Sequence, residues 1–195
     1  LMIGVSYARR LTQDFSVGVT MKFINQRIWN ETASGLGFDV GTQYRIGIGD
    51  LTIGMSMTNF GSDMKYDGQD LNVKYDAATE NPNNRLAPAK LASGDYPLPL
   101  HFQVGVSMTV LNMDGIRILA AADAAHPNDN QERVNLGTEI TIMDQFFLRG
   151  GYRFGYDMET ATFGAGALAS LSGSTIVFDY SYSLYNLLPN VHRVS

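Results

Sequence analysis

The sequence predicts an all-β protein, and more narrowly an up-and-down antiparallel β-barrel that spans a membrane. Apolar residues alternate with small or polar ones along most of the chain, as in residues 15–23 (FSVGVTMKF). A period of two is typical of strands that have one face in lipid. The connections between these segments also alternate between short and long, which is typical of an up-and-down barrel.

The composition is compatible with this prediction. The chain has 195 residues, of which 45% are hydrophobic, and a mean hydropathy of −0.08, which is too low for a helical membrane protein. Barrel strands expose only every second residue to lipid, so their mean hydropathy stays near zero. The chain has no cysteine, which excludes disulfides and thiolate metal sites. Its net charge of −5 and lack of a basic stripe argue against a nucleic-acid partner.

The alternating pattern divides into eleven expected strands. They lie near residues 2–10, 15–28, 36–47, 51–60, 100–111, 116–125, 133–142, 146–156, 161–171 and 175–185, with a shortened strand from residue 191. Tight turns are expected at 12–14, 49–50, 112–115, 143–145 and 172–174, and longer connections at 30–35, 61–99, 126–132, 157–160 and 186–190. We therefore expect periplasmic turns on one rim and extracellular loops on the other.

Both ends of the sequence lie within this pattern. The chain opens in an alternating segment with no signal-peptide features, and it closes about five residues into a strand, whereas a spanning strand needs about 9–11. We therefore expect one barrel domain, residues 1–195, that is the C-terminal portion of a longer chain. If both termini of the parent are periplasmic, its strand number is even, and three further strands at the front would give fourteen.

The pattern also assigns the side chains to two faces. Residues expected to face lipid are Phe38, Val40, Tyr44, Ile46, Leu51, Ile53, Met55, Met57, Phe102, Val104, Val106, Met108, Ile176, Phe178, Tyr180 and Tyr182. The polar residues expected to face the lumen are Asp39, Arg45, Arg117, Asp123, Glu139, Arg149, Arg153 and Asp179. An Arg or Lys at the lipid mid-plane costs about 2–4 kcal/mol, so charge is expected inside.

Several of these features have more than one interpretation. Arg149 and Arg153 are expected to pair with acidic residues on neighbouring strands, although they are also suited to an anionic solute. Residues 123–130 carry oxygen ligands and one His, so a calcium site is an alternative to ordinary turn chemistry. There is no GxSxG, P-loop or HExxH spacing, so we expect no enzyme activity, no catalytic residue, no metal and no cofactor; ligand-binding residues stay unknown.

Aromatic residues and one long connection mark the rims. Trp29, Tyr66, Tyr156 and Tyr185 suit an aromatic girdle at the long-loop rim, and Phe15 and Phe146 suit one at the other. Residues 61–99 form the longest connection and are either a functional segment, folded over the barrel mouth or docking a partner, or a disordered surface loop.

Ten short segments distributed along the whole chain form a recognisable series. They are residues 4–12 (GVSYARRLT), 27–30 (RIWN), 33–35 (ASG), 38–42 (FDVGT), 53–56 (IGMS), 59–61 (NFG), 96–100 (YPLPL), 125–130 (AHPNDN), 147–152 (FLRGGY) and 190–193 (NVHR). In order and approximate spacing they resemble the PorV/PorQ family of Bacteroidetes-type outer-membrane proteins. The resemblance implies a FadL-like barrel of fourteen strands, with an N-terminal plug and a signal peptide that this sequence lacks.

The same resemblance implies a location and a function. It implies the outer membrane of a Gram-negative bacterium, where the protein contacts lipid and acts as a non-enzymatic component of type IX-like protein secretion, with the translocon and secreted cargo as partners. The alternative is a FadL-like passive transporter of hydrophobic small molecules. A purely structural surface protein is a third possibility.

Overall fold

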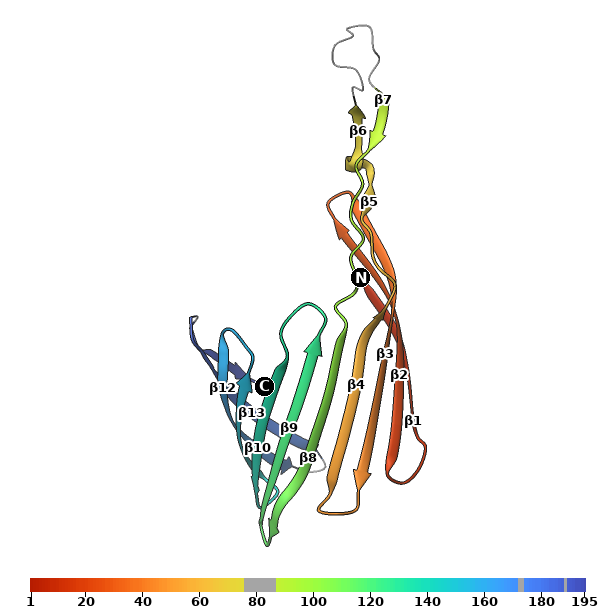
Figure 1. The fold of residues 1–195 in the computed structure, drawn as a ribbon. Coiled ribbons are helices and arrows are strands. Elements are labelled where there is room, and N and C mark those ends of the chain that lie inside the picture. The colour runs from red at the N-terminus through yellow and green to blue at the C-terminus, as the bar shows by residue number, and fades with distance from the viewer. Residues whose placement is uncertain (76–86, 172–173, 188) are drawn as a thin grey trace.

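The chain folds into one large antiparallel sheet that curves into an open trough (Figure 1). The structure, a computed structural model, describes residues 1–75, 87–171, 174–187 and 189–195. Its strands are β1 (Met2–Arg10), β2 (Phe15–Ile28), β3 (Glu31–Ile46), β4 (Leu51–Gly61), β5 (Asp67–Gly68), β6 (Asn72–Tyr75), β7 (Ala87–Lys90), β8 (His101–Met113), β9 (Ile116–Pro127), β10 (Arg133–Ile142), β11 (Phe146–Phe154), β12 (Glu159–Leu171), β13 (Ser174–Tyr185) and β14 (Val191–Val194).

The order of strands confirms the up-and-down topology. The sheet runs β1-β2-β3-β4-β8-β9-β10-β11-β12-β13-β14, and β5 pairs with β3 at one side. All eleven predicted strands are present in this path, most with bounds within a few residues of those expected. The main difference is β3, which starts at Glu31 instead of residue 36, so that residues 29–30 form a tight turn where a long loop was predicted.

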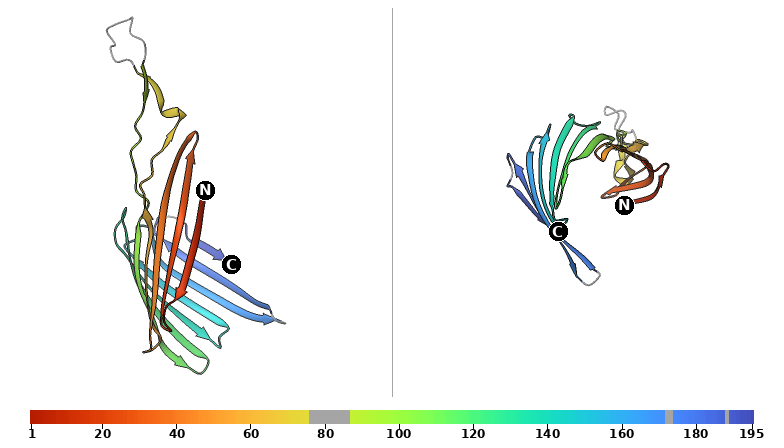
Figure 2. Two further views of the ribbon diagram at one scale, coloured as in Figure 1. Left: turned by 90° about the vertical axis from the view of Figure 1, so that its right-hand side faces the viewer. Right: turned by 90° about the horizontal axis from the view of Figure 1, so that it is seen from below.

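The sheet of this chain is not closed into a barrel, and the closure expected of a longer parent of fourteen strands stays a prediction. Strands β1 and β14 lie at opposite edges of the sheet and do not pair, and the view along the trough shows an open arc (Figure 2). Closure needs a first and a last strand that meet in register. Strand β14 has only four residues, Val191–Val194, which pair with β13, and every residue of β1 is exposed.

The turns on one rim have the backbone that tight hairpins need. Met143 and Asp144 between β10 and β11 both have positive φ, as do Gly49 and Asp50 between β3 and β4. Successive left-handed residues match the right-handed twist of the flanking strands. We call this the short-turn rim. The opposite long-loop rim carries the connections 62–100, 128–132, 155–158 and 186–190, together with the tight turn at 29–30.

Cross-strand pairing sorts the side chains of the sheet onto two faces. Residues paired across an antiparallel ladder share a face, and one row runs through Ile53, Val106, Ala122, Leu136 and Tyr152. All sixteen residues predicted to face lipid lie on this side, which we call the apolar face. Many of them are exposed, among them Phe38, Tyr44, Met55 and Phe178. The other side is the polar face.

Strands β2 and β3 rise beyond their neighbours. They continue for six residue pairs past the pairing of Gly37 with Gly61 at the end of β4, from Phe23–Leu36 to Ile28–Glu31. At about 3.3 Å per residue the hairpin therefore projects about 20 Å further along the strand direction. We call this projecting hairpin, together with residues 62–75 and 87–100 of the long connection, the arm.

A small hydrophobic core holds the arm together. Ala33 of β3, Met64 and Leu98 are buried, and Tyr66 and Tyr96 pack beside them with their rings stacked 5.5 Å apart. Met64 is completely buried, and an added Cβ at Gly35 would lie only 2.9 Å from its Cγ atom. The segments that contain Met64 and Leu98 therefore form a second layer, which packs on the polar-face side of the hairpin of β2 and β3.

The remainder of the long connection is also structured where it is described. Strand β5 pairs with β3, a 3-10 turn η1 (Gln69–Leu71) follows, and β6 and β7 form a separate two-stranded sheet that stands away from the trough (Figure 1). These described segments therefore do not fold over the trough as a lid. They also form regular structure, which differs from the alternative of a wholly disordered loop. Residues 76–86 lie outside the described residues.

Polar contacts reinforce the arm. Tyr66 and Tyr96 both donate hydrogen bonds to Oε1 of Gln26, at 3.0 and 3.2 Å. Burial and the neighbouring Tyr66 hydroxyl raise the pKa of Tyr96 to about 12, so it remains a neutral donor at physiological pH. A hydrogen bond from Lys90 lowers the pKa of Asp67, which lies 2.5 Å away in an exposed ion pair. Tyr66 is therefore part of the packing of the arm and does not belong to the aromatic girdle in which the sequence analysis placed it.

No helix in the described part of the chain is long and apolar enough to cross a membrane.

We expect Gly61→Ala to destabilise the base of the arm by about 1–3 kcal/mol. An added Cβ at Gly61 would lie 2.0 Å from the carbonyl oxygen of Leu36, so the backbone itself would have to move. The measurement is the urea midpoint of the protein refolded in detergent. Gly150→Ala is the matched control, since no atom lies within 4 Å of its added Cβ; equal midpoints for the two variants would contradict the close packing.

Candidate functional site on the polar face

The register places all eight predicted lumen-facing residues on the polar face. Most of their cross-strand partners are small or polar: Asp39 pairs with Thr20, Arg45 with Thr52, Arg117 with Thr141, Asp123 with Gly105 and Asn135, Glu139 with Arg149 and with the apolar Leu119, Arg153 with Asn135, and Asp179 with Gly166. Whether this face lines a lumen stays a prediction, because the sheet is open.

The hollow of the trough brings five of the eight together. A concavity of about 1070 Å³ over β9 to β14 is lined by Asp123, Glu139, Arg149, Arg153 and Asp179. The other three lie elsewhere. Asp39 faces a smaller hollow beside β2 and β4, Arg117 lies in another at the short-turn rim, and Arg45 is near the start of β4.

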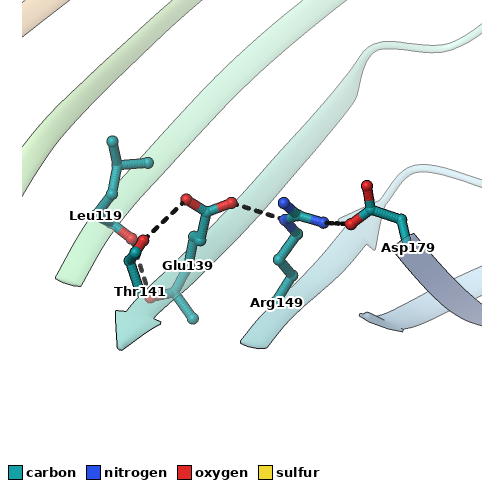
Figure 3. Close-up of polar contacts among 6 residues, drawn as sticks. Leu119, Glu139, Thr141, Arg149 and Asp179 are labelled. Atoms are coloured by element: carbon teal, nitrogen blue, oxygen red, sulfur yellow. Dashed lines mark hydrogen bonds and ion pairs between the residues drawn. The ribbon is translucent and has the colours of Figure 1, made fainter. Parts of the chain in front are cut away.

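An ion-pair ladder crosses the centre of this concavity (Figure 3). The Nε atom of Arg149 donates to Oε2 of Glu139 at 2.7 Å, and its Nη1 donates to Oδ1 of Asp179 at 2.5 Å. Thr141 donates a longer hydrogen bond of 3.4 Å to Glu139. The ladder joins β10, β11 and β13, and its side chains are partly exposed, so solvent screens the charges.

Two glycines in the intervening strand make the ladder possible. Strand β12 separates Arg149 from Asp179, and it presents Gly164 opposite Arg149 and Gly166 opposite Asp179. An added Cβ at Gly166 would lie 2.4 Å from Oδ1 of Asp179 and 3.4 Å from Nη1 of Arg149. The missing side chain therefore leaves the space through which Arg149 reaches across β12.

The other predicted charged residues in the concavity also have polar partners. Arg153 pairs with Glu159 of β12, and its guanidinium lies 5.5 Å from the centre of the Tyr156 ring. Asp123 accepts hydrogen bonds from Gln103 at 2.9 Å and from Asn135 at 2.8 Å. The prediction that Arg149 and Arg153 pair with acidic residues of neighbouring strands is thus confirmed. The five predicted charged side chains in the concavity are therefore ion-paired or hydrogen-bonded within the face.

One charged group on this face was missed from the sequence. Lys22 of β2 is only 9% exposed and donates to Oδ1 of Asp39 at 2.7 Å and to Oδ1 of Asn59 at 2.5 Å. The backbone N–H of Asn59, which has a positive φ, donates to the same Asp39 oxygen. The alternation of β2 puts Lys22 on this face, but no local pattern indicates its burial beside Gly37, where Leu98 of the arm also lies.

Metal binding has no support from the described residues. No group of three or more His, Cys, Asp or Glu side chains within them is placed to hold a metal ion. In the predicted calcium segment, His126 lies 3.5 Å from Glu132, and Asn128 donates to the carbonyl of Leu98. A further histidine contact lies on the apolar face, where the hydroxyl oxygen of Tyr180 is 2.7 Å from Nδ1 of His192.

Comparisons with known proteins do not assign the chain to a family. A scan against models of protein families gives no match, and a search of curated proteins finds no relative. What the structure shows is a large protein built from one all-antiparallel β-sheet.

We expect Gly166→Ala to destabilise the sheet by about 1–3 kcal/mol in the presence of Asp179, because the new methyl group displaces its carboxylate. In an Asp179→Ala background the same change should cost almost nothing, because the clash is gone. A double-mutant cycle on urea midpoints in detergent measures this coupling. Additive effects of the two substitutions would show that Gly166 does not serve the ladder.

Proposed function

We propose that the chain forms most of the wall of an outer-membrane β-barrel of PorV/PorQ type. The exposed apolar face is the main support. It extends across the eleven strands of the path from β1 to β14, and along the described residues of those eleven strands its only Arg, Lys, Asp or Glu residues are Arg9, near the short-turn rim, and Arg27, on the arm. Soluble monomers rarely expose a contiguous apolar surface of this extent.

The length of the apolar segment of β2 supports a bilayer as the covering medium. Along β2 the face is apolar from Phe15 to Phe23, a segment of nine residues. A tilted barrel strand needs about 9–11 residues to span the bilayer. Above Phe23 the same face becomes polar, with Asn25 bonded to Ser34 at 2.8 Å and Arg27 beside Thr32.

The open edges support further strands in the complete barrel. An unpaired strand edge is not tolerated in the hydrocarbon region, because its backbone N–H and C=O groups have no partner. Strand β1 is free along one side, and β14 covers only part of β13. We infer that additional strands lie between β14 and β1, in a FadL-like parent barrel of fourteen strands whose C-terminal portion is this chain.

For the activity we propose a non-enzymatic part in protein secretion of type IX kind, with cargo delivered to the cell surface. The polar face is the observation that favours this role over the transport of hydrophobic solutes. Its charged side chains pair across the concavity, which a hydrophobic ligand would have to cross. The folded arm on the long-loop rim adds a surface suited to a protein partner.

The test of the activity is affinity purification of the tagged full-length protein from its native outer membrane in mild detergent, followed by mass spectrometry. We expect a large translocon barrel, or proteins that share a C-terminal signal domain. A lone barrel that retains lipid-like molecules would overturn the secretion role in favour of FadL-like transport.

We expect Val104→Arg to block membrane assembly and its neighbour Gln103→Arg to be tolerated. Val104 lies on the apolar face, where an Arg costs ~2–4 kcal/mol near the bilayer centre. Gln103 lies on the polar face and bonds Asp123, so an Arg there meets a carboxylate. Heat-modifiable migration of the two variants in membrane extracts is the measurement; identical behaviour would refute the assignment of faces.

We expect proteinase K added to intact cells to cut the chain between Asp63 and Asp95 and to leave residues 112–115 intact. The first segment belongs to the arm on the long-loop rim, and the second is a turn on the short-turn rim. Fragment masses report the cut sites. Protection of the arm, with cutting at 112–115, would invert the proposed orientation.

A further inference from the structure

We propose that a polar clasp at the root of the arm fixes the direction in which the arm projects from the large sheet. The clasp consists of Lys22 of β2, Asp39 of β3 and Asn59 of β4, together with the carbonyl group of Pro99. This conformational device goes beyond the proposed function, because it depends only on contacts within the chain and holds for any partner of the arm.

The sheet can bend most easily where β4 ends. Up to the pairing of Gly37 with Gly61, strands β2, β3 and β4 lie side by side, and beyond it β2 and β3 continue as a two-stranded ribbon. Strand β5 joins this ribbon only at Glu31 and Thr32. Two-stranded ribbons twist more strongly than larger sheets and are marginally stable alone. The arm therefore needs contacts at its root to keep one direction.

The clasp lies at the level of this bending point. Lys22 pairs across the ladder with Gly37, and its Nζ donates to Oδ1 of Asp39 at 2.7 Å and to Oδ1 of Asn59 at 2.5 Å. The backbone N–H of Asn59 donates to the same Asp39 oxygen at 2.8 Å. Each of the three neighbouring strands thus contributes one residue to the network. Hydrogen bonds depend on angle, whereas apolar contacts are non-directional, so the network restricts the angle between the strands.

Asn59 also ties together the two ends of the long connection. It lies two residues before the end of β4, and its Nδ2 donates at 2.9 Å to the carbonyl of Pro99, two residues before β8 begins. The carbonyl groups of Leu98 and Leu100 accept from the side chain and the backbone N–H of Asn128, at 3.2 and 3.0 Å. Three successive carbonyl groups of the returning chain are therefore bonded to β4 and to the connection between β9 and β10.

Two features of the clasp cost stability and favour a role in geometry. Asn59 has a φ of 61°, in the left-handed region, where the register between β3 and β4 shifts. The side chains of Lys22 and Asp39 are only 11% and 24% exposed, so both charges lose much of their hydration. A buried ion pair adds little stability compared with apolar residues, and its best-supported use is to select one arrangement. The clasp therefore serves the direction of the arm more than its stability.

The experiment measures the distance between the arm and the sheet in the full-length protein in detergent. Spin labels are attached to cysteines that replace Ile28, 61% exposed near the tip of the hairpin, and Val106, 42% exposed on β8. Lys22→Met removes the ammonium group and keeps an apolar stem, and Asn59→Asp keeps the acceptor for Lys22 but loses the donor to Pro99. Pulsed electron paramagnetic resonance should give one narrow peak without these changes and a peak at least about twofold wider with either.

Asn190→Ala is the matched control, because it removes hydrogen bonds to Tyr182 and Tyr185 elsewhere on the same rim. It should leave the distance distribution unchanged. Circular dichroism checks that each variant keeps its β-sheet, and if Lys22→Met does not fold, Asn59→Asp alone decides. An unchanged narrow peak in the folded clasp variants, or equal broadening in Asn190→Ala, would overturn the proposal.

Discussion

The register of the antiparallel ladder is the constraint on which the rest of this structure depends. Because side chains alternate at every residue, a slip by one position would move a whole strand's apolar set to the opposite side of the sheet. Pairing continues through the eleven strands from β1 to β14, with register shifts in three strand pairs, and it produces both the apolar face and the polar face. The ion-pair ladder and the hollow follow from the same register, since they need Glu139, Arg149 and Asp179 on one side.

Small residues adapt this regular framework to its special features. Gly166 leaves the gap that lets Arg149 reach Asp179 across β12, and Gly61 and Gly35 allow the arm to pack closely on β3. The two sets act in different places. Gly166 serves the ion pairs inside the trough, and Gly61 and Gly35 serve the arm beyond the rim, so the charge pairing and the arm lie in separate parts of the molecule.

The sequence predicted the strands well, because each one alternates and is bounded by turn residues. It failed where stability comes from distant contacts. The start of β3, residues 31–35 (ETASG), lacks large apolar residues and resembles a loop, but Ala33 and Gly35 are needed there to accept Met64. The positions of Met64 and Leu98 likewise depend on contacts between segments that are distant in the sequence. The paired charges were predicted because acidic and basic residues recur at the same register, whereas barrel closure cannot follow from eleven strands alone.

Site-directed spin labelling along β8 tests most directly whether the apolar face contacts lipid. The chain has no cysteine, so single labels can be placed at residues 102–108 of the full-length protein in lipid vesicles without a background signal. The account predicts that accessibility to oxygen peaks at Phe102, Val104, Val106 and Met108, and that accessibility to a water-soluble nickel complex peaks at the three positions between them. Uniform access of the nickel complex along the strand would contradict it.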